Sequence, residues 1–285
     1  MTHRNVRISL AIALIAAAFV AVAPAAHADP EPIHGVYAQD DSPSGYDDIV
    51  GAVLNTVIVS ASEDQLDLAH SKGLKAVVWL GEYNRNRWGV EDEASRCKFF
   101  YDDQWIQDYV TPIAGHPAIA AYLIADEPSY ARQYGCDLWS DLRNRSDLVK
   151  SIDPSNPTYT TLPAQDGIEA YPYIHIAGSV DILGLVIYPC SYEWDTWGGC
   201  QWNLIERAIA EADAAGIDRY WAVMQGFGDT WYREPTFEEL ETQFDMWRNS
   251  RAEGSFVLDW ERIASMGADQ LLTLSPLPPG DPGDP

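Results

Sequence analysis

Residues 119–128 read IAAYLIADEP, and the prediction of the fold starts from this stretch. Its first seven positions are all apolar or aromatic, and the two acids and the proline that follow end the run. A strand that is apolar at every position has both faces buried, as in a parallel sheet covered by helices. The stretch therefore predicts a buried parallel strand that carries Asp126 and Glu127 at its carboxyl end.

Similar runs recur before and after this stretch, separated by segments with the apolar period of a helix. We predict further strands at 34–38, 56–60, 75–80, 158–162, 182–188, 220–224 and 255–258. We predict helices at 62–72, 102–113, 137–151, 203–215 and 236–249. Strands alternating with helices over roughly 250 residues predict the α/β class and a single (β/α)8 TIM barrel. The alternative is a doubly wound open sheet, which needs a glycine-rich phosphate loop after the first strand, where this chain has the acidic segment 39–42.

The first residues have the pattern of a targeting segment. Arg4 and Arg7 precede the apolar run 10–22, and the small-x-small sequence AHA follows at 26–28. This pattern predicts a cleaved secretory signal peptide, and the alternative is an uncleaved membrane anchor. We therefore expect a secreted protein without membrane attachment. The predicted segments are 1–28, the signal peptide, 29–275, the barrel, and 276–285, a disordered Pro/Gly-rich tail.

The composition is acidic and rich in aromatic residues with a polar edge. Lys and Arg number 18 against 43 Asp and Glu, for a formal net charge of -25. This balance argues against binding to nucleic acid or to an anionic membrane surface. The 11 Trp and 15 Tyr outnumber the 7 Phe, and such rings suit half-wet surfaces. We expect a monomer that has no nucleic-acid partner.

Four cysteines allow three pairings, and export would permit disulfides. Cys190 and Cys200 lie ten positions apart around a Trp/Gly-rich segment, so we predict that they pair. Cys97 then pairs with Cys136. Because the sequence has no CxxC or HxxxH spacing, we expect no zinc site, and no residue pattern calls for a cofactor.

The residues after the predicted strands indicate a carbohydrate substrate. An active site in such a barrel lies at the carboxyl ends of the strands. The residue types there are carboxylates, amides and indole rings, which can bind sugar hydroxyls and stack on sugar C–H faces. The residues that we predict to contact substrate are Asp40, Tyr83, Tyr188, Trp194, Trp197, Gln225, Trp231 and Trp260.

Asp126 and Glu127 are the candidates for acid/base chemistry. Two adjacent carboxyl groups that are partly buried raise the pKa of one of them, as a general acid requires near neutral pH. The alternative is a pair of solvated loop acids in a very acidic protein. Glycoside hydrolysis needs two carboxyl groups, one of them protonated to assist the leaving oxygen.

The stretch 121–128 resembles the fourth strand of the large superfamily of (β/α)8 glycoside hydrolases, the clan A or cellulase-like barrels. That strand ends in Asn-Glu-Pro or Asp-Glu-Pro. The resemblance implies that Glu127 is the acid/base and that Asp126 holds the substrate. Tyr188 in VIYP resembles the family's strand 6 tyrosine, and Trp260 matches a frequent tryptophan at the end of strand 8.

The chain departs from this family at the end of strand 7, where the family places its nucleophilic Glu and this sequence has Gln225. Three interpretations remain open. A second carboxylate comes from another strand, with Asp259 ranked ahead of Glu82 and Asp40 also a candidate; or the amide orients an intermediate; or catalysis is lost and sugar binding is kept. We therefore predict a secreted hydrolase of O-glycosidic bonds in a poly- or oligosaccharide. The alternatives are an inactive glycan-binding barrel and a secreted interaction protein whose acidic surface gives solubility.

Overall fold

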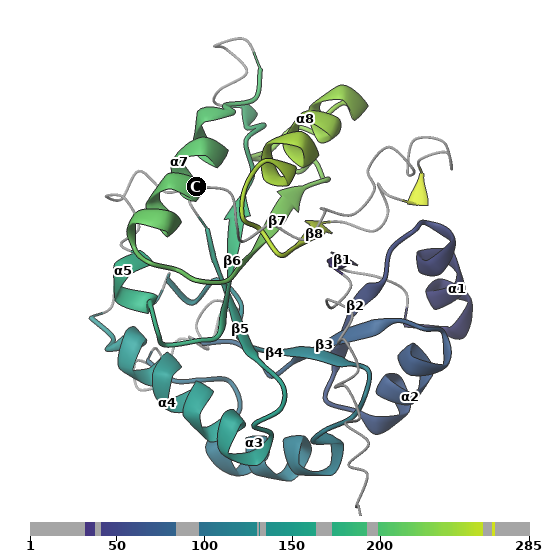
Figure 1. The fold of residues 1–285 in the computed structure, drawn as a ribbon, viewed down its shortest axis with the longest axis vertical. Helices are drawn as coiled ribbons and strands as arrows, with labels where there is room; N and C mark the ends of the chain where they lie inside the picture. Colours follow the sequence, from purple (N-terminus) through teal and green to yellow (C-terminus); the bar gives the residue numbers. More distant parts are fainter. Residues whose placement is uncertain are drawn as a thin grey trace, which may run out of the picture. The chain divides into compact units, whose positions relative to one another are not determined.

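Eight parallel strands close into a barrel in the order of the chain, with β8 pairing to β1. The computed structural model describes residues 32–37, 41–83, 97–129, 131, 135–163, 173–192, 199–258 and 264–265. The strands are β1 (Ile33–Val36), β2 (Thr56–Ser60), β3 (Lys75–Trp79), β4 (Ile119–Ala125), β5 (Thr158–Pro163), β6 (Ile182–Ile187), β7 (Tyr220–Gln225) and β8 (Gly254–Leu258). Helices surround them (Figure 1), and the predicted (β/α)8 barrel is confirmed.

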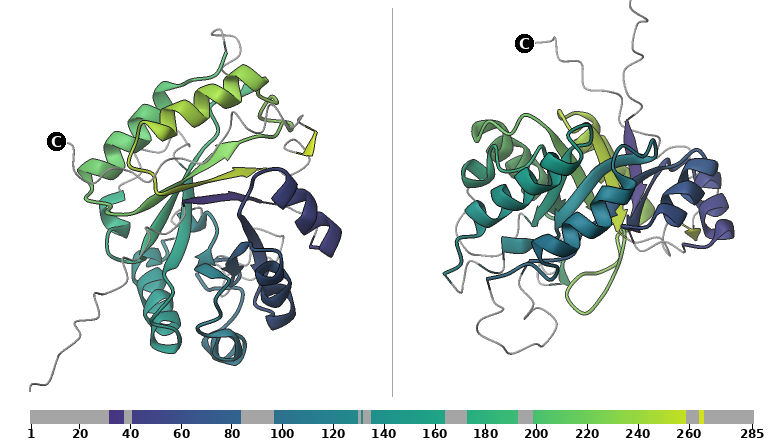
Figure 2. Two further views of the ribbon diagram at one scale, coloured as in Figure 1. Left: turned by 45° about the vertical axis from the view of Figure 1, so that its right-hand side comes forward. Right: turned by 90° about the horizontal axis from the view of Figure 1, so that it is seen from below.

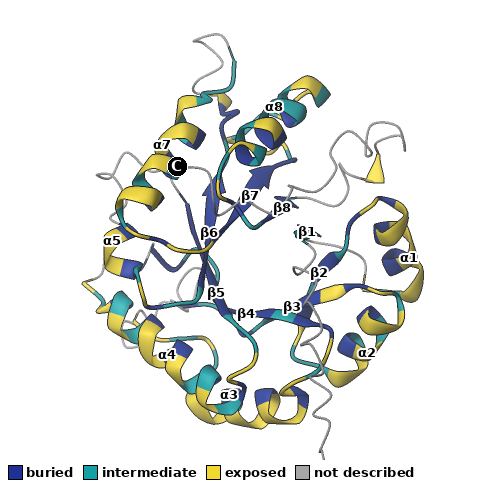
Figure 3. Cartoon of the chain, viewed as in Figure 1, coloured by how far each residue is buried: buried dark blue, intermediate teal, exposed yellow. Residues whose placement is uncertain are grey.

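The helices follow the strands and lie around the barrel (Figure 2), and their exposed faces point outward (Figure 3). They are α1 (Pro43–Gly51), α2 (Glu63–Ser71), α3 (Asp103–Val110), the 3-10 helix η3 (Thr111–Ile113), α4 (Leu138–Ile152), α5 (Tyr173–Ile176), α7 (Asn203–Ala214) and α8 (Phe237–Arg248). Each of the five helices predicted above has a counterpart, with ends that differ by a few residues; a further short helix predicted before the tail lies mostly outside the described residues. In addition, α1 and α5 form where we predicted no helix.

Helix α1 begins at a residue typical of helix starts. Ser42 is its N-cap and accepts a hydrogen bond from the Gly45 amide at 3.1 Å. Pro43 follows at the first helical position, where its fixed φ suits the helix and its missing N–H costs nothing. The helix then buries Tyr46 and Ile49 against the barrel.

The barrel interior is filled by side chains from alternate strand positions. This inner core includes Val77, Leu123, Tyr159, Val186, Trp221 and Phe256. The intervening positions face the helices and form the larger outer core. Only glycine fits at position 35, because a Cβ there would lie 2.3 Å from the Phe256 ring.

The end of β4 is irregular in a way that positions the acids. The register with β5 shifts between Leu123 and Ala125, so one extra residue is inserted on β4. Leu123 belongs to the inner core, whereas Ile124 and Ala125 both belong to the outer core. The extra residue shifts the inward and outward alternation of the side chains by one position beyond the bulge. Asp126, which follows the outward Ala125, is therefore expected on the inner side of the barrel.

A stack of aromatic rings runs along α3. The Tyr101 and Trp105 rings are nearly parallel, with centroids 3.8 Å apart, and Trp105 and Tyr109 are 4.4 Å apart. Trp79, at the end of β3, meets the Tyr101 ring edge-on at 6.1 Å. The rings therefore form a continuous series from the end of a barrel strand to the half-exposed Tyr109.

Both predicted disulfides are confirmed. Cys97 pairs with Cys136 and Cys190 pairs with Cys200, with Cα–Cα distances of 5.2 and 4.1 Å. No helix in the described part of the chain has the length and apolar character that a bilayer span requires. The predicted signal peptide 1–28 and tail 276–285 lie outside the described residues.

Candidate functional site

Asp126 and Glu127 lie at the carboxyl end of β4, and one hydroxyl group holds them both. Thr161 on β5 donates a hydrogen bond to Asp126 Oδ1 at 2.5 Å. The same hydroxyl oxygen accepts a hydrogen bond from the Glu127 amide at 2.8 Å. Thr161 is fully buried, and both acids are half-buried. The hydrogen bonds and the partial burial fix both acids at the mouth of the barrel, unlike two solvated acids on a loop.

Glu127 has a backbone conformation that side chains rarely adopt. Its φ is +42°, in the left-handed region that favours glycine. A residue held there costs about 1–3 kcal/mol, and such residues cluster at active sites and ligand clamps. The strain therefore marks Glu127 as a candidate functional residue independently of the sequence resemblance.

Three tyrosines lie near the acids: Tyr159 is fully buried, and Tyr37 and Tyr188 are half-buried. Burial raises the pKa of Tyr188 well above its usual value, and the charges of Glu127 and Asp126 raise it further. Burial likewise raises the pKa of Tyr37, with added contributions from Tyr159 and Asp126. The Tyr37 and Tyr159 hydroxyls lie 3.4 Å apart. These phenols stay protonated at ordinary pH, so each keeps a hydroxyl proton that it can donate in a hydrogen bond.

Sequence reasoning missed Tyr37, Tyr159 and Thr161. Tyr37 follows β1, and the other two belong to β5. Tyr159 is the second residue of β5 and Thr161 the fourth, so a search of the residues that follow the strands does not find them.

Three half-exposed rings form what we call the aromatic wall: Tyr188, Phe227 and Tyr232. Their centroids are 4.9 Å (Tyr188–Phe227), 5.4 Å (Tyr188–Tyr232) and 5.7 Å (Phe227–Tyr232) apart, all in edge-on geometry. Because Glu127 and Asp126 both act electrostatically on Tyr188, the Tyr188 end of the wall lies near the acid pair. Such rings can pack against the C–H faces of a sugar. Of the three, only Tyr188 was among the predicted contact residues.

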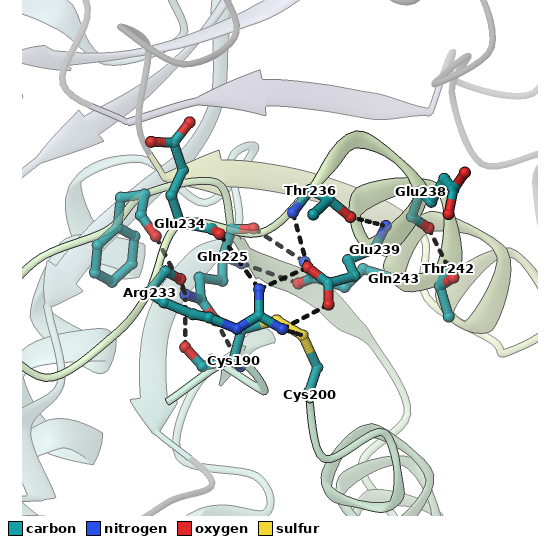
Figure 4. Close-up of polar contacts among 11 residues, drawn as sticks. Cys190, Cys200, Gln225, Arg233, Glu234, Thr236, Glu238, Glu239, Thr242 and Gln243 are labelled. Carbon is teal, nitrogen blue, oxygen red and sulfur yellow. Dashed lines mark hydrogen bonds and ion pairs between the residues drawn. A yellow bond between two sulfur atoms is a disulfide. The ribbon is translucent and has the colours of Figure 1, made fainter. Parts of the chain in front are cut away.

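Gln225, for which we predicted a substrate contact, is fully buried. Its Oε1 accepts a hydrogen bond from the Cys190 amide at 2.9 Å. Its Nε2 lies among the carbonyl oxygens of Cys190, Phe227 and Arg233, at 3.2, 3.1 and 2.8 Å. Figure 4 shows the side chain within these contacts. The structure thus surrounds this amide with backbone groups of the loops after β6 and β7.

Tyr83, for which we also predicted a sugar contact, is buried. Its hydroxyl donates to Asp141 on α4, and its ring meets Phe99 edge-on at 4.9 Å. It therefore packs between the end of β3 and the helical layer. Glu82, the preceding residue, is half-buried after β3, and Trp231 is 68% exposed in the loop after β7.

The other predicted site residues lie outside the described part of the chain. These are Asp40, Trp194, Trp197, Asp259 and Trp260.

One group of described residues brings three potential metal ligands together: Cys190, Cys200 and Glu239 have ligand atoms within 4.8 Å of one another. Both sulfurs are joined in a disulfide, and the thiolate is the form that binds metals. In this disulfide-bonded state the group is not a metal site.

The sequence matches no family model and no curated protein. Several solved structures share its fold. The β-galactosidase from the psychrophilic Marinomonas ef1 has a TM-score of 0.60 and 11% identity over 80% of this chain. A β-galacturonidase from Eisenbergiella tayi bound to galacturonate has a TM-score of 0.58, and the Lactobacillus rhamnosus β-glucuronidase one of 0.54, each with 15% identity over 80% of this chain. This chain shares the barrel fold of these three structures.

This finding confirms, at the level of the fold, the resemblance that the stretch 121–128 carries. The match covers 54% of the Marinomonas chain and 43% of each of the other two. This chain therefore corresponds to about half of those proteins or less.

Proposed function

We propose that this protein is a secreted glycoside hydrolase that acts on a poly- or oligosaccharide. The observation that carries the proposal is the strained Glu127 at the mouth of the barrel, with its backbone and the neighbouring Asp126 held by one buried hydroxyl. In this proposal Glu127 is the general acid/base that protonates the leaving glycosidic oxygen. Asp126 binds a sugar hydroxyl or tunes Glu127.

A second carboxylate completes the reaction. Asp259, after β8, is our first candidate, followed by Glu82 after β3 and Asp40 after β1. A separation from Glu127 of about 5–5.5 Å would give retention of the anomeric configuration through a covalent intermediate. A separation of about 6.5–9.5 Å would leave room for a water molecule and give inversion.

The aromatic wall and the protonated tyrosines support a sugar as the substrate. Tyr188 faces the charge of Glu127 and can donate a hydrogen bond to a sugar or an intermediate. The names of the similar structures, a β-galactosidase, a β-galacturonidase and a β-glucuronidase, also favour a carbohydrate. Two disulfides are compatible with an extracellular location, as the signal pattern predicts.

The test is product release from a panel of plant, fungal and bacterial polysaccharides. We expect Glu127→Gln to lower kcat by about 10²–10⁴-fold, because it removes a proton donor and keeps the size of the side chain. Glu63→Gln, at the exposed start of α2, is the matched control and should retain full activity. Full activity of Glu127→Gln would overturn the assignment.

A glycan-binding barrel without catalysis is the second candidate function. It is favoured by one observation, the buried amide of Gln225 at the end of β7, where related hydrolases carry a carboxylate. Binding of one glycan by both the wild type and Glu127→Gln, with no product from either at any pH, would support it.

A further inference from the structure

Gln225 belongs to a closed series of contacts that links two loops to α8 (Figure 4). Gln243 on α8 accepts from the Gln225 backbone N–H at 3.1 Å and donates to the Gln225 carbonyl at 3.0 Å. One turn earlier, Glu239 pairs with Arg233 through two hydrogen bonds of 2.5 and 2.7 Å. Arg233 Nη2 lies 3.3 Å from Cys200 Sγ, and Cys200 is bonded to Cys190. The Gln225 amide, which bonds both backbone groups of Cys190, closes the series.

We call this series the brace: Gln225, Gln243, Glu239, Arg233 and the Cys190–Cys200 disulfide. The brace is anchored on helix α8, because Glu239 also forms the capping box with Thr236 at the start of this helix. Gln225 and Gln243 are fully buried. The brace therefore joins the loops after β6 and β7 to one another and to the helical layer.

The chemistry at position 225 requires an amide. Oε1 faces an N–H donor, whereas Nε2 faces three carbonyl oxygens at 2.8–3.2 Å. A carboxylate of the same shape would place a negatively charged oxygen against those three acceptors in a site without solvent exposure. Burial of a charge without a compensating donor is strongly unfavourable.

The brace also reaches every ring of the aromatic wall. Phe227 and Tyr232 lie on the segment between Gln225 and Arg233, and Gln225 bonds the carbonyls of Phe227 and Arg233. Tyr188 lies two positions before Cys190, whose amide and carbonyl Gln225 also bonds. Movement of the Gln225 side chain would thus release both loops that carry the wall.

We propose that Gln225 is a positioning residue whose amide holds the aromatic wall beside Glu127, and that it is not the remnant of a catalytic carboxylate. The role in substrate binding rests on the proposed function, whereas the requirement for an amide does not.

The first experiment is Gln225→Glu, followed by thermal unfolding against pH. Burial and the three carbonyls should raise the pKa of the introduced carboxyl in the folded state. Below the pKa of a Glu in the unfolded chain, about 4.3, the introduced carboxyl is neutral in both states and its charge costs no stability. As pH rises above that value, folding has to keep the carboxyl protonated or bury its charge, so the free energy of unfolding falls. We expect Tm to lie about 5 °C or more below wild type at pH 7, with the gap narrowing towards pH 4. Gln107→Glu, on the exposed face of α3, should show no such trend.

The second experiment is Gln225→Met, which keeps the length of the side chain and removes its polar atoms. We expect faster hydrogen exchange at the amides of Cys190, Tyr192 and Arg233, which lie in bonds within and between the two loops. With the substrate found in the panel, KM should rise about tenfold and kcat should change less. Combined with Tyr232→Ala, the effect on KM should be non-additive, because both changes act on the wall.

Higher activity of Gln225→Glu at wild-type stability would overturn the proposal and make position 225 an unfilled nucleophile site. Unchanged exchange in Gln225→Met, or KM effects that add independently, would overturn the positioning role. If wild type turns over no glycan, the proposed function fails by itself, and the unfolding and exchange results still decide whether the amide is required.

Discussion

At the end of β4 a glutamate occupies a backbone conformation that glycine usually adopts. Glu127 has a φ of +42°, and its amide bonds the Thr161 hydroxyl. The conformation is unfavourable by itself, so the surrounding structure has to hold it. Strain of this kind is expected where function requires a side chain in a particular place.

We predict that Glu127→Gly stabilises the fold while it removes activity. Glycine relieves the strain at positive φ, so the free energy of unfolding should rise by about 1 kcal/mol. Glu127→Gln keeps the strain and should leave stability within about 0.5 kcal/mol of wild type. Urea unfolding of the three proteins measures both effects. A glycine variant less stable than the glutamine variant would contradict the interpretation.

Sequence reasoning found Asp126 and Glu127 because they directly follow an apolar run. It did not find Thr161, because that contact crosses from β4 to β5 and depends on the bulge after Leu123. It assigned Gln225 to substrate by its place at a strand end. The direction of that side chain depends on loops whose conformation the local sequence pattern does not encode.

One charged side chain, Asp153, connects the end of α4 to its neighbours. Asp153 is buried at the C-cap of this helix. Burial by itself would raise the pKa of its carboxyl. Hydrogen bonds from Ser155, Asn156, Gly115 and Tyr122 outweigh burial and hold the pKa well below its usual value. One carboxylate thereby links α4 to β4, to the turn after η3 and to the loop before β5.

This pKa shift predicts a specific acid sensitivity. A carboxyl whose pKa is lower in the folded state stabilises the fold above its unfolded pKa of about 3.9, and that stability is lost as pH falls further. Asp153→Asn should cost about 1.5–3 kcal/mol at pH 7 and should weaken the dependence of stability on pH below 4. Asp147→Asn, at an exposed position of the same helix, should behave like wild type. If urea unfolding shows the same loss of unfolding free energy below pH 4 for wild type and Asp153→Asn, this prediction is contradicted.

The strands could be predicted from sequence because each is a short run rich in apolar, β-branched or aromatic residues, separated from the next by a segment of helical period. Helix α1 was missed because Ser42, Pro43, Ser44 and Gly45 are residues of turns as well as of helix starts. Helix α5 has four residues, which is too short for an apolar period to be visible. The local pattern thus fails to reveal a helix whose start resembles a turn, and a helix of a single turn.

For the whole molecule, the two disulfides should differ in what they contribute. Cys97–Cys136 spans 39 positions and Cys190–Cys200 spans 10. The loop-entropy model assigns them about 4 and about 3 kcal/mol. We predict that replacing the first pair by serines costs more stability, whereas replacing the second pair costs more activity, because that pair belongs to the brace.

Urea unfolding and kcat/KM of the two double variants test this contrast. The serines match the cysteines in size, so each variant serves as the control for the other. A greater loss of kcat/KM in the Cys97/Cys136 variant would contradict the assignment of the brace to the site.

The barrel could be predicted because strand and helix patterns alternate along the chain. Its closure, however, depends on contacts between the first and the last strand. Pairing of β1 with β8 completes the ring that brings Tyr37 to Tyr159, 122 positions away. The inner core and the mouth therefore combine residues that no local window of sequence contains.

The ring series that ends at Tyr109 has an optical consequence. Tyr101, Trp105 and Tyr109 stack at 3.8 and 4.4 Å, and Trp79 adjoins them. At such separations the excited states of neighbouring rings couple, and their near-ultraviolet circular dichroism depends on mutual orientation. The near-ultraviolet circular dichroism of the protein therefore includes a contribution that depends on the packing between the end of β3 and α3.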